Sequence, residues 1–175
     1  MTIGIDFDNT IVNTKEVSKR YLDIYMPNNQ LDSYHNLPYE EEIAFFAKYN
    51  IQITNDLELF SNVKETFAFF KRNNIKLILI TARGYDNEKQ IDATKEFLKR
   101  NNLSFDKYIF CARDKAQICK QNHVDLMIDD IEEVLDKIYK QNINVLKYGS
   151  ESQKYNYALN WQDVINYIRK EYQCE

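Results

Sequence analysis

The chain has 175 residues, which is long enough for one domain with a substantial core and a small insertion. Its hydrophobic fraction of 44% excludes an intrinsically disordered protein, and no apolar run approaches the roughly 20 residues that a membrane-spanning helix needs. The net charge of −4 argues against a broad nucleic-acid-binding surface, although a local basic site for a small phosphorylated compound stays compatible with it.

The cysteine content indicates a reducing compartment. Cys111, Cys119 and Cys174 are an odd number, and they lack the spacing of metal ligands. The N-terminus enters an apolar stretch at once, without the basic segment and long apolar core of a secretory signal. We therefore expect a cytoplasmic protein that does not bind a membrane.

Apolar runs alternate with helical patterns along most of the chain. Near-continuous Ile, Leu and Val runs predict the buried strands of a parallel sheet, and apolar residues at i, i+3, i+4 and i+7 predict helices. The alternation favours a doubly wound, Rossmann-like α/β domain. In chain order we expect a strand at 2–7, a helix near 63–70, a strand at 75–80, a helix near 91–98, a weaker strand at 108–110, a strand at 124–128, a helix near 131–138, a weaker strand at 143–146 and a helix near 161–168.

Residues 14–60 interrupt this alternation. They contain no convincing strand, but two helical patterns joined by a looser stretch from 27 to 38. Such a segment is too long for a simple crossover, so we expect a small helical cap over the carboxyl edge of the sheet. The predicted organisation is an α/β core of residues 1–13 and 61–175 with a cap of residues 14–60. The aromatic residues Tyr34, Tyr39, Phe45 and Phe46 are expected to form the small core of the cap, unless one of them stacks on a nucleobase.

Polar residues stand where the three strongest predicted strands end. Asp6 and Asp8 follow the first strand, two positions apart and therefore on one face of an extended chain. Thr81 follows the second strand, and Asp129 and Asp130 follow the third. The carboxyl ends of parallel strands meet at one edge, where open α/β sheets bind ligands. Several carboxylates there need positive charge, which favours a divalent ion with oxygen ligands, Mg²⁺ in particular.

This set of residues resembles the four signatures of the haloacid dehalogenase superfamily of phosphohydrolases. The stretch from Asp6 to Thr10 resembles the first motif, Thr81 the second, and Lys115 the lysine of the third. The pair of residues 129 and 130 is similar to the paired-aspartate form of the fourth. The motifs occur in the order of the family, so the resemblance covers the chain outside the cap. Asn9 stands where glycine is common, and asparagine tolerates a left-handed backbone better than most residues.

The resemblance implies an aspartyl-phosphate mechanism. Asp6 would attack phosphorus as a nucleophile. Asp8 would protonate the leaving oxygen and later deprotonate a water molecule. The ligands of Mg²⁺ would be Asp6, the backbone carbonyl of Asp8 and Asp129. Asp130 is counted with the metal site, where it would contact the metal or orient a water molecule on the metal or Lys115, unless it only caps the following helix.

The resemblance also assigns residues to the substrate phosphate. Thr81, the Ala82 amide and Lys115 would hold the phosphoryl oxygens. Arg83 either reaches a substrate phosphate or lies on the surface, and the sequence leaves both possibilities open. We count it among the candidate phosphate-binding residues.

The position and helical pattern of the cap resemble 5′(3′)-deoxyribonucleotidases and their bacterial nucleotidase-like relatives. The first hypothesis is therefore a Mg²⁺-dependent phosphatase of nucleoside monophosphates. Alternatives are a phosphatase of another small ester, such as a sugar phosphate or phosphoglycolate, and a polynucleotide 3′-phosphatase, against which the acidic balance counts. A non-catalytic binding protein is the least favoured. The sequence does not indicate the oligomeric state.

Overall fold

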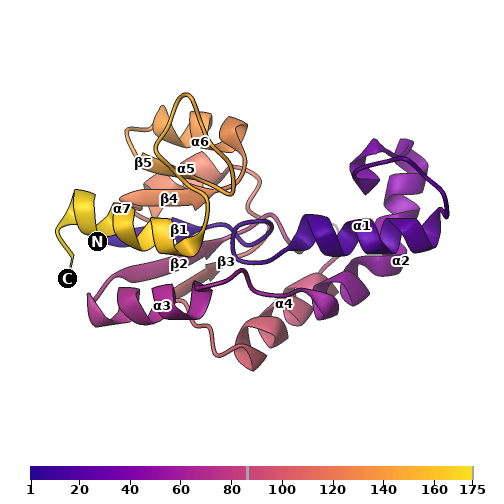
Figure 1. The fold of residues 1–175 in the computed structure, drawn as a ribbon, viewed down its shortest axis with the longest axis horizontal. Helices are drawn as coiled ribbons and strands as arrows, with labels where there is room; N and C mark the ends of the chain where they lie inside the picture. Colours follow the sequence, from indigo (N-terminus) through magenta and orange to yellow (C-terminus); the bar gives the residue numbers. More distant parts are fainter. Residues whose placement is uncertain (86, 175) are drawn as a thin grey trace.

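A parallel sheet forms the centre of the protein, for which a computed structural model describes residues 1–85 and 87–174. Within these residues, six strands lie in the order β3-β2-β1-β4-β5-β6, and every neighbouring pair is parallel (Figure 1). Helices flank the sheet on both faces, which confirms the predicted doubly wound α/β fold. The strands are β1 (Thr2–Ile5), β2 (Lys76–Ile80), β3 (Lys107–Ile109), β4 (Leu126–Asp129), β5 (Asn144–Tyr148) and β6 (Tyr157–Ala158).

Two apolar cores lie on opposite faces of the sheet, because successive side chains of a strand point to opposite sides. Leu77 and Leu79 of β2 belong to one core, and Ile78 and Ile80 belong to the other. Among the described residues, no helix is both long and apolar enough to cross a membrane. The helices of the first core are α3 (Val63–Arg72), α4 (Lys89–Arg100) and α7 (Trp161–Tyr172), and those of the second are α5 (Lys115–Gln121) and α6 (Glu132–Tyr139).

The predicted elements are present, with differences at their ends. The first strand ends at Ile5 rather than at residue 7, so the chain leaves the sheet before the first predicted site residue. β6 was not predicted, because two residues carry no periodic signal. Ile131, expected on the apolar face of a helix, instead precedes α6 and is 47% exposed.

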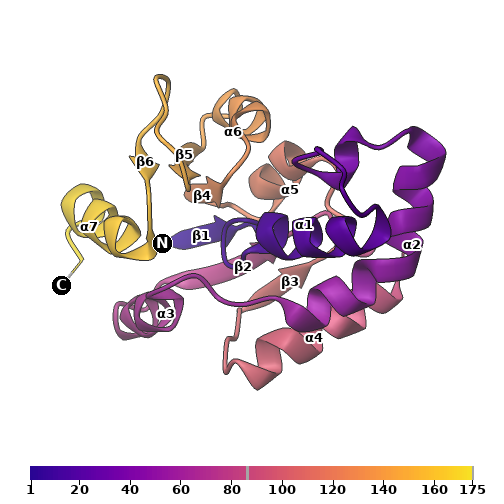
Figure 2. The same cartoon turned by 45° about the vertical axis from the view of Figure 1, so that its right-hand side comes forward.

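The segment between β1 and α3 is helical, as expected, and it projects beyond the carboxyl end of the sheet (Figures 1 and 2). It contains α1 (Thr14–Tyr25), a 3₁₀ turn (Tyr34–Asn36) and α2 (Tyr39–Asp56). Figure 2 shows α2 beside α4, and Arg100 of α4 donates a hydrogen bond to the Asn55 carbonyl of α2. The segment is thus attached to the core at α4 as well as through the chain.

An aromatic cluster stabilises this helical segment. Phe45 is fully buried, and its ring centroid lies 5.6 Å from that of Tyr25, 5.0 Å from that of Tyr34 and 5.4 Å from that of Tyr49. The expectation that Tyr39 joins this core is wrong, because its side chain is 77% exposed. Tyr39 is the first residue of α2, where few neighbours can cover a side chain.

A close approach of side chains at Gly4 in the middle of β1 explains the glycine there. A Cβ atom at this position would lie 2.8 Å from Sδ of Met127 and 3.0 Å from Cδ1 of Ile80. Those distances are shorter than van der Waals contact, so the second core packs directly on the backbone of β1. The strand that leads to Asp6 is thereby tightly held on this face.

Candidate active site

Three site residues stand at the carboxyl ends of neighbouring strands. Asp6 directly follows β1, and its amide donates to the Ile128 carbonyl of β4 over 3.0 Å. Thr81 directly follows β2, and Asp129 is the last residue of β4. Because β1 lies between β2 and β4, the topology brings these three residues together. All three side chains are buried.

Lys115 bridges two of the carboxylates. Its Nζ lies 2.6 Å from Oδ1 of Asp6 and 2.7 Å from Oδ2 of Asp129. Lys115 is the first residue of α5, a start that Asp114 fixes by accepting a hydrogen bond from the Gln117 amide over 3.0 Å. Burial alone would lower the pKa of Lys115, but the two carboxylates outweigh that effect and hold the pKa above its usual range. The lysine is therefore a firmly charged group inside the site.

Three carboxyl groups could hold a cation. Asp6, Asp129 and Asp130 each offer an oxygen, and these atoms lie within 4.8 Å of one another. Burial is the main cause that raises the pKa of Asp6 to about 8 and that of Asp130 to about 6, and the charge of Asp129 raises both further. The single ammonium group of Lys115 cannot balance three carboxylates. A hard divalent cation would supply the missing positive charge. The donor set of carboxylate oxygens therefore fits Mg²⁺.

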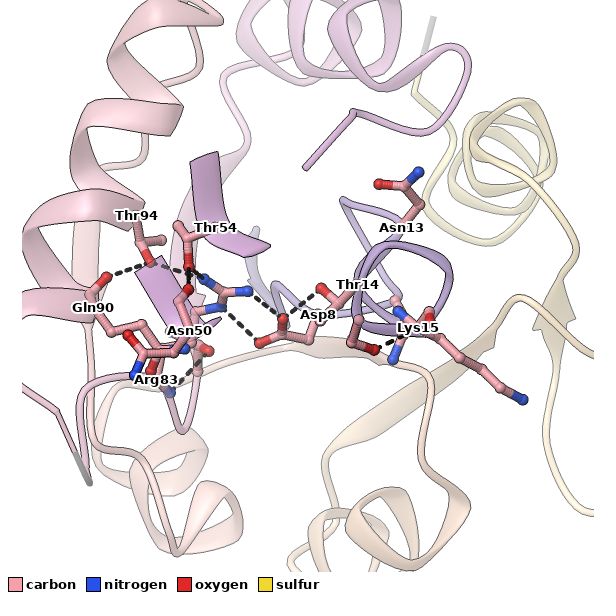
Figure 3. Close-up of polar contacts among 12 residues, drawn as sticks. Asp8, Asn13, Thr14, Lys15, Asn50, Thr54, Arg83, Gln90 and Thr94 are labelled. Atoms are coloured by element: carbon pink, nitrogen blue, oxygen red, sulfur yellow. Dashed lines mark hydrogen bonds and ion pairs between the residues drawn. The ribbon is translucent and has the colours of Figure 1, made fainter. Parts of the chain in front are cut away.

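Asp8 has a different partner from Asp6. Nε of Arg83 lies 2.8 Å from Oδ2 of Asp8, and Nη2 lies 2.6 Å from Oδ1 (Figure 3). The Thr14 hydroxyl donates a further hydrogen bond to Oδ1 over 2.5 Å. Burial would raise the pKa of Asp8, but the charge and hydrogen bonds of Arg83 and the Thr14 hydroxyl bring it below its usual value. The two aspartates of the first motif are therefore electrostatically distinct.

The loop after β1 is fixed at both ends. Asn9 has a left-handed backbone, with a φ of 53°, which its residue type tolerates as the sequence indicated. Its Oδ1 accepts a hydrogen bond from the Lys15 amide over 2.7 Å at the start of α1. The Thr10 carbonyl accepts one from the indole of Trp161 over 2.9 Å. These contacts hold the loop that carries Asp8.

Hydrogen bonds also hold residues 81–84 after β2. The Thr81 carbonyl accepts a hydrogen bond from the Ala112 amide over 2.9 Å. Gly84 has a φ of 91°, a conformation that favours glycine, and its amide donates to Oε1 of Gln90 over 3.1 Å. Ala82 is exposed on the cavity between these anchored residues. The turn can thus present Thr81 and Ala82 to a ligand.

A cavity of about 860 Å³ connects the strand ends with the helical segment. Tyr34, Phe46 and Asn50 line it from the helical segment, and Tyr85 lines it from the turn after β2. The rings of Tyr34 and Phe46 are stacked, with their centroids 6.3 Å apart. The core residues that line it include Asp6, Asp8, Thr81, Ala82, Arg83, Lys115 and Asp130. Asp129 completes the set through its ion pair with Lys115.

The structure thus brings the eight predicted site residues to one place. Asp130 does not cap the next helix: α6 begins at Glu132, and within the described residues no side chain caps it. The Arg83 guanidinium points at Asp8, Thr54 and Thr94 (Figure 3). The contacts of these two threonines could not be predicted from the sequence, since a lone threonine within a helix gives no signal of its own.

Comparison with known proteins identifies the fold. No known family profile matches the sequence. A nucleotidase of Clostridium acetobutylicum is 24% identical over 139 residues, which cover 74% of this chain and 70% of that protein. A haloacid dehalogenase-like hydrolase of Streptococcus pneumoniae superposes with a TM-score of 0.68 at 15% identity, over 95% of this chain and 97% of its own. A β-phosphoglucomutase of Clostridium difficile also gives 0.68 at 15% identity, over 98% and 96%.

These likenesses identify the fold. The haloacid dehalogenase-like hydrolase of Streptococcus pneumoniae shares the fold of this chain over almost the whole length of both. The predicted superfamily resemblance is confirmed at the level of the fold. At identities of 15%, the solved structures do not identify a substrate.

Proposed function

We propose that the protein is a Mg²⁺-dependent phosphomonoester hydrolase that forms an aspartyl-phosphate on Asp6. The observation that carries this proposal is the contact of Lys115 with both Asp6 and Asp129 at the carboxyl edge of the sheet. A buried carboxylate beside a fixed ammonium group and further carboxylates suits nucleophilic attack on a phosphoryl group. When bound by Asp6, Asp129 and Asp130, Mg²⁺ would neutralise the charge of the substrate phosphate.

The residues divide the reaction between them. A carboxylate oxygen of Asp6 forms a bond to phosphorus while the ester bond breaks. Asp8, whose pKa Arg83 holds low in the free protein, takes up a proton from the incoming phosphate monoester monoanion and gives it to the leaving oxygen. In the second step a water oxygen bonds to phosphorus, the bond to Asp6 breaks, and Asp8 takes a proton from that water. Thr81, the Ala82 amide and Lys115 hold the phosphoryl oxygens throughout.

We further propose that residues 14–60 act as a cap that selects a nucleoside monophosphate. The stacked rings of Tyr34 and Phe46 offer an apolar face to a base, and the Asn50 side chain lies beside them on the cavity wall. A cavity of about 860 Å³ has room for a nucleotide. The 24% identical nucleotidase of Clostridium acetobutylicum supports the same substrate class.

A sugar phosphate or another small ester is the second candidate. The structural likeness to a β-phosphoglucomutase favours it, although at 15% identity that likeness concerns the fold. A polynucleotide 3′-phosphatase agrees less well with the net charge of −4.

The test is a substrate panel at saturating Mg²⁺, with nucleoside monophosphates, sugar phosphates, phosphoglycolate and a 3′-phosphorylated oligonucleotide. We expect the highest kcat/KM for a nucleoside monophosphate and a clear dependence on the base. Equal rates with all bases would reject the nucleotidase proposal. No hydrolysis of any ester by the wild-type protein would reject the phosphatase proposal itself and favour a binding protein.

A further inference from the structure

We infer that Arg83 is a positioning residue, which aims the Asp8 carboxyl group at the leaving oxygen, and not a ligand of the substrate phosphate. The inference rests on the proposed phosphatase function and deepens it. It starts from the contacts of the guanidinium group, whose side chain is only 4% exposed although it borders the cavity.

The hydrogen bonds of Arg83 are nearly saturated within the protein. Nε and Nη2 form a fork on the two oxygens of Asp8, at 2.8 and 2.6 Å. Nη1 donates to the Thr54 hydroxyl over 2.9 Å and to the Thr94 hydroxyl over 3.2 Å (Figure 3). A guanidinium group has five N–H donors, and these contacts use four of them. The remaining N–H, on Nη2, could give a phosphate one hydrogen bond at most, so a forked contact with a phosphate would require Arg83 to give up its fork on Asp8.

The two threonines are set to accept these bonds. The Thr54 hydroxyl donates its only proton to the Asn50 carbonyl over 2.7 Å, and the Thr94 hydroxyl donates its proton to the Gln90 carbonyl over 2.7 Å. Each hydroxyl oxygen can then only accept from Arg83. Both threonine side chains are fully buried, so without the guanidinium group each hydroxyl oxygen would lose a hydrogen-bond donor.

The face and the edges of the guanidinium are therefore both fixed. The Phe7 ring lies under it, with Cζ 4.5 Å from the ring centroid. Thr54 belongs to α2 of the helical segment, and Thr94 belongs to α4 of the core. Arg83 thus links the loop after β1 to α2 and α4. Binding of a phosphate would not require these contacts with the two helices.

The fork leaves one oxygen of Asp8 for the chemistry. Among the described residues, Oδ1 accepts from both Arg83 and Thr14, whereas Oδ2 accepts from Arg83 alone. The Asp8 side chain also keeps 31% exposure on the cavity side. Oδ2 is thus the atom that carries the proton: the proton moves to the ester oxygen as the P–O bond breaks, and a water proton returns to Oδ2 when water attacks the aspartyl-phosphate.

The test compares leaving groups of similar size but different basicity. 4-Nitrophenolate leaves from phosphorus with little help from an acid, whereas phenolate and the 5′-oxygen of a nucleoside need a proton. We expect Arg83→Met to keep kcat/KM for 4-nitrophenyl phosphate within about threefold of the wild type. For phenyl phosphate and a nucleoside monophosphate, kcat/KM should fall by about 100-fold, the scale of general acid catalysis.

Four further variants make the comparison decisive. Asp8→Asn should give the same dependence on the leaving group, and the double variant should lose little beyond either single change, since the two residues act as a unit. Arg83→Lys keeps the charge but not the fork, and it should also show the effect if Arg83→Met fails to fold. Arg72→Met, at an exposed position of α3, is the control and should match the wild type.

Equal losses in kcat/KM on all three esters would show a phosphate-binding or merely structural role and would overturn the inference alone. Wild-type rates in both Arg83 variants would do the same. A wild-type protein that hydrolyses none of the esters would overturn the proposed function, and this inference with it.

Discussion

Lys115 and Asp6 lie 109 positions apart in the sequence, yet Nζ of the lysine is 2.6 Å from Oδ1 of the aspartate. The contact joins the start of α5 to the residue that follows β1, and the strand after α5, β4, pairs with β1. The proposed nucleophile is thus held next to the charge that would stabilise the phosphoryl group in the transition state.

Removal of this ammonium group should abolish most of the activity. We expect Lys115→Met to lower kcat by about 100-fold or more, because a fixed charge on the phosphoryl oxygens is lost. The matched control is Lys120→Met, which changes an exposed lysine of the same helix and should keep wild-type kcat. The measurement is steady-state hydrolysis of 4-nitrophenyl phosphate with Mg²⁺. A Lys115→Met enzyme with more than half of the wild-type kcat would contradict the assignment.

The carboxylate cluster should bind Mg²⁺ in the absence of substrate. We expect Asp130→Asn to weaken binding by about tenfold or more, because one of three candidate oxygen ligands loses its charge. Titration calorimetry on metal-free protein measures this without any turnover. Asp92→Asn, at an exposed position of α4, should leave binding unchanged. Equal affinity of Asp130→Asn and wild type would remove Asp130 from the metal site.

The aromatic wall of the cavity should contribute to nucleotide binding. We expect Phe46→Ala to raise KM for a nucleoside monophosphate by about tenfold, the scale of one base–aromatic stacking contact. KM for a sugar phosphate should change little, which makes that substrate an internal control. If KM rises equally for both, Phe46 supports the fold of the helical segment rather than the base.

The cysteines offer a test of the packing behind Lys115. Burial, the largest cause, raises the pKa of the Cys119 thiol to about 12, so that about one part in ten thousand is thiolate at pH 8. We expect iodoacetamide to label exposed Cys111 rapidly in the native protein and Cys119 only in denaturant. Peptide mass spectrometry identifies the labelled residue. Rapid native labelling of Cys119 would show that α5 does not pack as described.

The position of the candidate site could be predicted from the sequence for a simple reason. In a parallel sheet, the carboxyl ends of all strands lie at the same edge, so polar residues that directly follow apolar strands meet there. Asp6, Thr81 and Asp129 could therefore be placed together without any knowledge of their contacts. Lys115 required the family resemblance, because a lysine at a helix start is usually a surface residue.

The contacts of Arg83 could not be predicted in this way. Its side chain contacts Asp8 of the loop after β1, Thr54 of α2 and Thr94 of α4. These three partners come from segments that are far apart in the sequence and meet only in the folded protein. No local pattern records such an arrangement. The exposure of Tyr39 is a similar case, since helical spacing alone does not say which end of a helix is left uncovered.

The most direct test of the account is to find the covalent intermediate. The enzyme is mixed with a nucleoside monophosphate and Mg²⁺, quenched in acid within the first turnovers, and reduced with borohydride, which converts an aspartyl-phosphate into homoserine. Mass spectrometry of the N-terminal peptide should place homoserine at position 6 and leave Asp8 intact, and Asp6→Asn should show neither the modification nor hydrolysis. Hydrolysis at the wild-type rate by Asp6→Asn, or modification at another aspartate, would contradict the assignment of Asp6 as the nucleophile.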